Sequence, residues 1–136
     1  MSLERFVKAP YGVYPRALAE LKAGRKQSHW MWFIFPQIAG LGHSAMAQMY
    51  AIASLDEART YLAHPLLGAR LRECCEAVLA VDGKSAHQIF GSPDDLKFRS
   101  SLTLFAQAAP DERLFRNLLQ RHYVGEADQL TLQKLR

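Results

Sequence analysis

Cysteine is scarce in this chain: the sequence of 136 residues holds two, Cys74 and Cys75, side by side. Neighbouring helical residues point about 100° apart, which is a poor geometry for a disulfide between them. The longest apolar run covers about seven residues before Pro36, far short of the ~20 residues of a membrane-spanning helix. Residues 1–5 lack the apolar stretch and cleavage site of a secretory signal. We therefore expect a cytoplasmic protein with no membrane partner.

The chain also lacks the common motifs for metals, phosphates and nucleic acids. Its five histidines show no ligand spacing and accompany no Cys or Glu motif, so we expect no metal site. Gly40-Leu41-Gly42 is too short for a phosphate-binding loop, and we expect no cofactor. The net charge is +4, but the basic residues are dispersed except for Lys22, Arg25 and Lys26. Because this cluster follows a predicted helix, whose carbonyl end favours cations, we expect no nucleic-acid partner.

Helical periodicity dominates the sequence, and no clear strand pattern is present. Hydrophobic residues make up 49% and charged residues 22%, which is typical of a folded soluble domain. Helix start signals occur at Pro15, Ser54, Pro65, Ser85, Ser92-Pro93-Asp94-Asp95 and Pro110-Asp111, and a last helix is expected over 127–135. We expect Ser54 and Glu57 to form a capping box, and Ser92 to cap the helix that starts at Pro93. Glycine stop signals occur at Gly24, Gly83, Gly91 and Gly125. The pattern predicts an all-α fold, a single compact domain over residues 1–136 with about six to eight short helices.

The most unusual segment is the aromatic run His29-Trp30-Met31-Trp32-Phe33-Ile34-Phe35-Pro36-Gln37. Aromatic surface on every side fits neither an amphipathic helix nor a half-exposed strand, so we expect a core element or a pocket wall. In an extended segment Trp30 and Trp32 face alike, whereas in a helix they diverge by about 200° and at most one lines a pocket. Because Pro36 restricts Phe35 to an extended conformation, any helix must end there.

Residues 26–37, followed by Gly40-Leu41-Gly42, resemble the most characteristic segment of domain-of-unknown-function family 1810. Nearly the whole chain agrees with this family, including Leu3-Glu4-Arg5-Phe6, Tyr50-Ala51-Ile52, His64-Pro65, Ile89-Phe90-Gly91, Ser100-Ser101 and Thr103-Leu104-Phe105. The sequence departs from the family at Pro10-Tyr11-Gly12, where members usually carry a glutamine. The resemblance implies a small helical domain and no assigned activity.

The polar residues around the aromatic run define a candidate site. The tryptophans supply aromatic surface, while His29 and Gln37 give orientation at its two ends. Asp94, Lys97 and Ser101 lie along one stripe of a predicted helix, with Ser100 beside it, and Lys97 with the two hydroxyls would receive an anion. Alternatively, this stripe is a solvated face with an Asp94–Lys97 ion pair. The predicted ligand-binding residues are Lys26, Ser28, His29, Trp30, Trp32, Gln37, Lys97, Ser100 and Ser101, and His29 is the candidate catalytic residue.

Our first hypothesis is a small-molecule site for a nucleotide or an ADP-ribose-like ligand. It predicts that His29 and Lys97 converge within about 10 Å across a concave surface. The residues do not decide whether the protein is an enzyme; a hydrolase or transferase without metal or redox cofactor would be the simplest type.

Two other kinds of function are consistent with the sequence. A non-catalytic protein-interaction module would expose some of Trp30, Met31, Trp32 and Phe35 as a convex patch. An anion-binding surface would use Arg25 and Lys26 together with Arg70 and Arg72, and its binding would depend on salt.

Overall fold

The computed structural model describes residues 3–8 and 12–136, so the departure at Pro10-Tyr11 lies outside the described residues. The helices are α1 (Glu4–Lys8), α2 (Tyr14–Lys22), α3 (Met31–Ile34), α4 (Ala45–Met49), α5 (Leu55–Ala63), α6 (Leu67–Leu79), α7 (Ala86–Phe90), α8 (Asp94–Ala108), α9 (Arg113–Tyr123) and α10 (Gln129–Lys134). The described part contains no strand, and its isolated β-bridge joins Ile38 and Ile52. The expected all-α class is confirmed.

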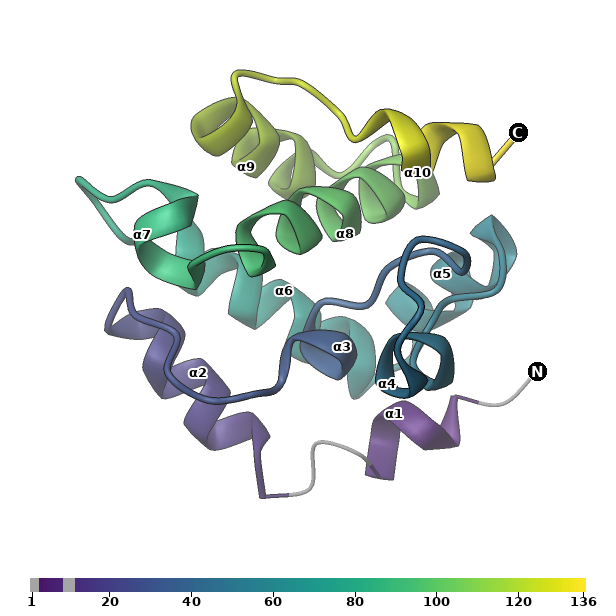
Figure 1. Cartoon of the computed structure of the whole chain (residues 1–136), viewed down its shortest axis with the longest axis horizontal. Coiled ribbons are helices and arrows are strands. Elements are labelled where there is room, and N and C mark those ends of the chain that lie inside the picture. The colour runs from purple at the N-terminus through teal and green to yellow at the C-terminus, as the bar shows by residue number, and fades with distance from the viewer. Residues whose placement is uncertain (1–2, 9–11) are drawn as a thin grey trace.

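The long helix α8 is the centre of a single compact domain. Its buried residues, which include Phe98, Leu102 and Leu104, lie on several sides of the helix, as expected where other helices enclose it. Helices α5, α7, α9 and α10 pack against α8, while α6 packs against α2, α3, α5 and α9. Figure 1 shows α8 across the middle, with α9 and α10 on one side and α1 to α4 on the other. Among the described residues, no helix combines the length and apolar character needed to cross a bilayer.

Several helix boundaries agree with their sequence signals. Pro15 lies in the first turn of α2, and Gly24 follows that helix with a left-handed φ of 72°. Ser85 and Gln88 form a complete capping box at the start of α7. His64 has a structural role, because its Nδ1 accepts hydrogen bonds from two backbone N–H groups at the start of α6.

Three details of the predicted helices are wrong. The described residues form ten helices rather than six to eight, because α1, α3 and α4 are too short to show a periodic pattern. Ser54 caps α5 by accepting from the Glu57 N–H at 3.1 Å, but the Glu57 carboxylate accepts from the Ala53 N–H at 2.9 Å and does not complete the capping box. The N-cap of α8 is Pro93, without a side-chain bond, so Ser92 is not its cap.

Backbone hydrogen bonds hold the segment between α3 and α5. The Ala39 N–H donates to the Ile52 carbonyl, and the Ile52 N–H donates to the Gln37 carbonyl, each at 2.8 Å. Farther along, Gly42 passes so close to α4 that a Cβ atom there would lie 2.6 Å from the Ala47 Cβ. The segment that follows the aromatic run is therefore fixed beside α4.

Candidate functional site

Glu20 on α2 holds the turn that leads into the aromatic run. Its Oε1 accepts from the N–H groups of Gln27 at 2.8 Å and Ser28 at 3.0 Å and from the Trp30 indole at 3.0 Å, and its Oε2 accepts from the Ser28 hydroxyl at 2.6 Å. Burial raises the pKa of Glu20, but these hydrogen bonds outweigh burial and lower it to about 2. We did not predict this role, since carboxylates that bond a turn several residues away have no characteristic spacing.

The two tryptophans of the aromatic run have different surroundings. The run is helical in α3 and ends at Phe35, as expected from Pro36. Trp30 is 0% exposed and its ring packs against Phe35, with ring centroids 6.2 Å apart. Trp32 is half-buried and lines a hollow at the surface. The helical alternative is confirmed, and Trp30 has no surface left to contact a ligand.

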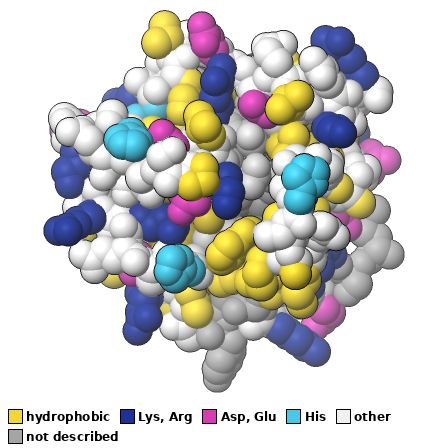
Figure 2. Space-filling view, viewed as in Figure 1, with side chains coloured by type: hydrophobic (Ala, Val, Ile, Leu, Met, Phe, Trp, Pro, Cys, Tyr) yellow, Lys and Arg dark blue, Asp and Glu magenta, His cyan; other side chains and the backbone are white. Residues whose placement is uncertain are grey.

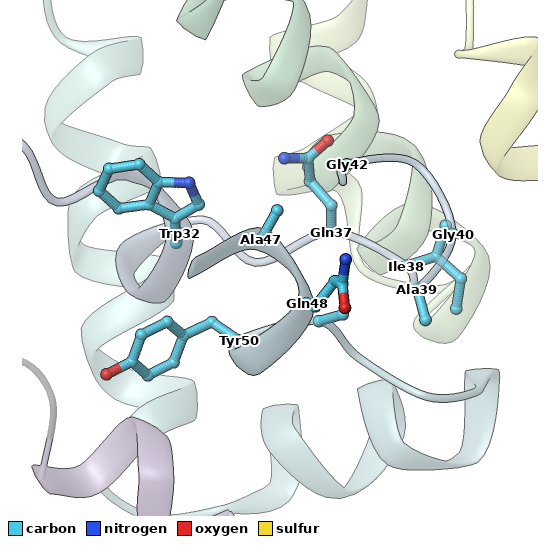
Figure 3. Close-up of a pocket in the computed structure, with 10 residues that line it drawn as sticks. Trp32, Gln37, Ile38, Ala39, Gly40, Gly42, Ala47, Gln48 and Tyr50 are labelled. Atoms are coloured by element: carbon cyan, nitrogen blue, oxygen red, sulfur yellow. The ribbon is translucent and has the colours of Figure 1, made fainter. Parts of the chain in front are cut away.

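Two adjoining hollows lie beside α4. The smaller, of about 130 Å³, lies between Trp32, Tyr50 and the segment that begins at Gln37. The larger, of about 600 Å³, lies between the loop that precedes α4 and the start of α8. Gln37, Gly42 and Ala47 line both hollows. Figure 3 shows the side chains of Trp32, Ala47 and Gln37 on the same side of α4, and Figure 2 shows apolar side chains gathered over α3 and α4 beside the charged start of α8.

Asp94, at the start of α8, lies between two lysines that each contact a tryptophan ring. Lys26 Nζ lies 2.9 Å from Asp94 Oδ2 and 4.9 Å from the Trp30 ring centroid, and its side chain is 7% exposed. Lys97 Nζ lies 3.8 Å from Asp94 Oδ1 and 5.6 Å from the Trp32 ring centroid, and its side chain is 31% exposed. The Asp94–Lys97 ion pair that the alternative interpretation predicted for a solvated helix face is thus present. Its distance is longer than that of the Asp94–Lys26 pair. Lys97, which lines the larger hollow, is the lysine that a ligand can reach.

Gln37 and Ser100 add polar groups to the larger hollow. The side-chain amide of Gln37 has no hydrogen-bond partner among the described residues, so both its donor and acceptor groups are available. The Ser100 hydroxyl donates to the Leu96 carbonyl at 3.2 Å, so in this orientation it can only accept a further hydrogen bond.

The other predicted site residues lie outside the two hollows. His29 is exposed and lines neither hollow. We expected His29 and Lys97 to share one concave surface, but only Lys97 lines a hollow. Ser101 is 1% exposed and belongs to the core, and Ser28 is bonded to Glu20. Of the nine predicted ligand-binding residues, the structure therefore brings together Trp32, Gln37, Lys97 and Ser100.

Sequence reasoning missed several residues around the larger hollow. Leu96 is 56% exposed and Leu130 is 58% exposed, and both line it. His43 also lines it, and its position just after Gly40-Leu41-Gly42, near Gln37, was a usable signal. Leu130 comes from α10, and no sequence pattern indicates that this helix lies beside α4 and α8.

The remaining candidate groups have structural roles. Cys74 and Cys75 are buried and free, and burial raises the pKa of the Cys74 thiol to about 12, so neither is an activated nucleophile. The described part contains no group of three or more His, Cys, Asp or Glu residues that could hold a metal ion. Arg72 pairs with Glu112 at 2.8 Å, and the Arg70 guanidinium lies 4.6 Å from the Tyr14 ring centroid. Two of the three arginines of the proposed anion-binding surface, Arg70 and Arg72, are thus engaged with other side chains.

The fold and the hollows define a small all-α domain with two adjoining surface hollows: Trp32 lines the smaller, Lys97 lines the larger, and Gln37 lines both. The chain belongs to the family described as Protein of unknown function (DUF1810), which matches residues 1–135. It is also similar to the crystal structure of the conserved hypothetical protein Rv1873 from Mycobacterium tuberculosis, with 52% identity and a TM-score of 0.96 over 98% of this chain and 95% of that chain. No curated protein matches the chain.

Proposed function

We propose that this protein binds a small ligand that carries an aromatic ring and an anionic group, such as a nucleotide or an ADP-ribose-like molecule. The ring packs against Trp32, the anion pairs with Lys97, and the Gln37 amide forms hydrogen bonds with a polar edge of the ligand. The ligand occupies the two adjoining hollows, and we place the protein in the cytoplasm, where its two free thiols would stay reduced.

The position of Lys97 Nζ, 5.6 Å from the ring centroid of the half-buried Trp32 and at the edge of the larger hollow, is the observation that carries this proposal. It puts a cation and an aromatic surface within the span of one small molecule. The volume of about 600 Å³ falls within the usual range for small-molecule sites. The side-chain amide of Gln37, which lines both hollows and has no hydrogen-bond partner among the described residues, can also hydrogen-bond to a ligand and so discriminate between ligands of different shape.

A second candidate function is protein binding at the same place, and the exposure of Leu96 and Leu130 favours it. These side chains flank the larger hollow and are 56% and 58% exposed. The convex aromatic patch first expected for such a module does not form, because Trp30, Met31 and Phe35 are at most 1% exposed. A protein partner would therefore contact the leucines rather than the aromatic run.

Thermal-shift and calorimetric titration with AMP and ADP-ribose test the small-molecule proposal. At a hundred times its dissociation constant, a ligand should stabilise the wild-type protein by about 2.7 kcal/mol. We expect Trp32→Ala and Lys97→Met each to weaken binding at least about tenfold, which corresponds to ~1.4 kcal/mol. Trp32→Phe should retain most of the affinity, since it keeps an aromatic surface.

Lys22→Met is the matched control for Lys97→Met, because it removes one exposed cation from α2 outside both hollows. His29→Ala should also bind normally. Absence of stabilisation by either ligand at millimolar concentration would reject the small-molecule proposal. If Leu96→Asp and Leu130→Asp then abolished the capture of a protein partner that the wild type binds, the second candidate would replace it.

A further inference from the structure

We infer that Asp94 is a positioning residue that limits the charge of the site, so that the ligand's anion is singly charged, as in a carboxylate or a phosphodiester. This inference rests on the proposed function and specifies the class of ligand. Asp94 was part of no predicted binding set, yet it contacts both lysines near the tryptophans.

The geometry gives the two lysines different tasks. Lys26 is bound at 2.9 Å by Asp94 and donates to the Ser28 carbonyl at 2.7 Å, with almost no exposed surface. It therefore fixes the Asp94 carboxylate to the turn before α3. Lys97 lies 3.8 Å from the other carboxylate oxygen, so it is oriented over Trp32 while its ammonium still has donors for a ligand.

The charges of this group set the preferred charge of the ligand. Two lysines and one aspartate sum to +1, so a singly charged anion neutralises the group. Two other charged residues line the larger hollow and are not counted in this sum: Arg99 pairs with Glu126 at 3.4 Å, and the Asp128 carboxylate accepts hydrogen bonds from the Thr131 N–H and hydroxyl. A second negative charge on the ligand would face the Asp94 carboxylate across Lys97 without a further cation to compensate it.

The test compares two adenine nucleotides that differ in charge at pH 8: cyclic adenosine 3′,5′-monophosphate carries one negative charge and AMP carries about two, because its second phosphate pKa is near 6. Both are titrated calorimetrically into the wild type and Asp94→Asn. The ratio of AMP affinity to cyclic-nucleotide affinity should rise about threefold to tenfold in Asp94→Asn, the size expected for one charge about 6 Å away at a partly exposed site. Comparing ratios removes the effect of ligand shape.

Asp95→Asn is the matched control. It removes the same charge from the same turn of α8, but its carboxylate pairs with His87 at 3.3 Å and with neither Lys26 nor Lys97, so the ratio should change less than twofold. If Asp94→Asn does not fold, the wild type alone gives the answer. The ratio of AMP affinity to cyclic-nucleotide affinity should then be higher at pH 5, where AMP carries about one negative charge, than at pH 8, where it carries about two.

The outcomes separate the two proposals. If both nucleotides bind but neither the Asp94 substitution nor the change of pH alters their affinity ratio, the inference about Asp94 is wrong and the proposed function stands. If neither nucleotide binds the wild type at millimolar concentration, the proposed function and the inference both fail. A ratio that shifts equally in Asp94→Asn and Asp95→Asn would also overturn the inference, because the effect would then be one of overall charge.

Discussion

At the scale of single residues, the aromatic run depends on one carboxylate. Trp30 can be fully buried because its indole N–H has an acceptor in Glu20, and an unpaired buried donor would be costly. The same carboxylate binds the backbone of Gln27 and Ser28, which fixes the path of the chain into α3. Burial of Trp30 in turn places Trp32, two residues later, at the surface beside Lys97.

Glu20→Gln should destabilise the protein and change its response to acid. We expect a loss of about 1–2 kcal/mol in the free energy of unfolding, because charge-assisted hydrogen bonds are replaced by neutral ones. The folded pKa of Glu20, about 2, lies below its ordinary value of 4.5, so its contribution is complete above pH 4.5 and is lost as the pH falls towards 2. Urea unfolding between pH 7 and pH 3 measures both effects.

Glu76→Gln is the control for this measurement, because Glu76 is exposed and its side chain forms no hydrogen bond or ion pair among the described residues. It should change stability by less than about 0.5 kcal/mol. Equal losses in the two variants would show that Glu20 acts only through overall charge.

At the scale of helices, close contact between α5 and α6 depends on a glycine inside a helix. Gly68 lies in the first turn of α6, where a Cβ atom would lie 2.1 Å from the Leu62 carbonyl oxygen. That carbonyl accepts from Arg72 at 3.1 Å, and Arg72 also pairs with Glu112 before α9. The sequence indicates a helix here but not the contact, because glycine in a helical pattern has no single meaning.

Gly68→Ala should destabilise the protein, although alanine is the better helix former by about 1 kcal/mol. The added methyl group meets backbone rather than a flexible side chain, so we expect a net loss of about 1–3 kcal/mol in the free energy of unfolding. Ala69→Gly, at the next and exposed position, is the reciprocal control and should lose about 1 kcal/mol through helix propensity alone. A Gly68→Ala protein more stable than the wild type in urea would contradict the close approach.

At the scale of the whole molecule, local signals and long-range packing were predictable to different degrees. Caps and apolar spacing located the longer helices, since these depend on neighbours a few residues apart. The site was only partly predictable, because Trp32, Gln37 and Lys97 meet through the packing of α3, α4 and α8. A histidine next to an aromatic run could be catalytic or simply exposed, and the sequence does not distinguish these possibilities. The structure places His29 at the exposed surface.

The acid stability of the whole domain above pH 5 should depend on His122 in α9. Its Nε2 is buried without a hydrogen-bond partner among the described residues, and burial, together with the nearby Arg121, lowers its pKa below 6.5. The unfolded chain therefore binds a proton more readily than the folded one, so stability is complete above about pH 6.5 and falls as the pH drops towards the lowered pKa. His122→Leu should flatten this dependence in urea unfolding between pH 8 and pH 5, whereas His43→Gln, at an exposed position, should leave it unchanged. An unaltered slope in His122→Leu would mean that another group takes up the proton on unfolding.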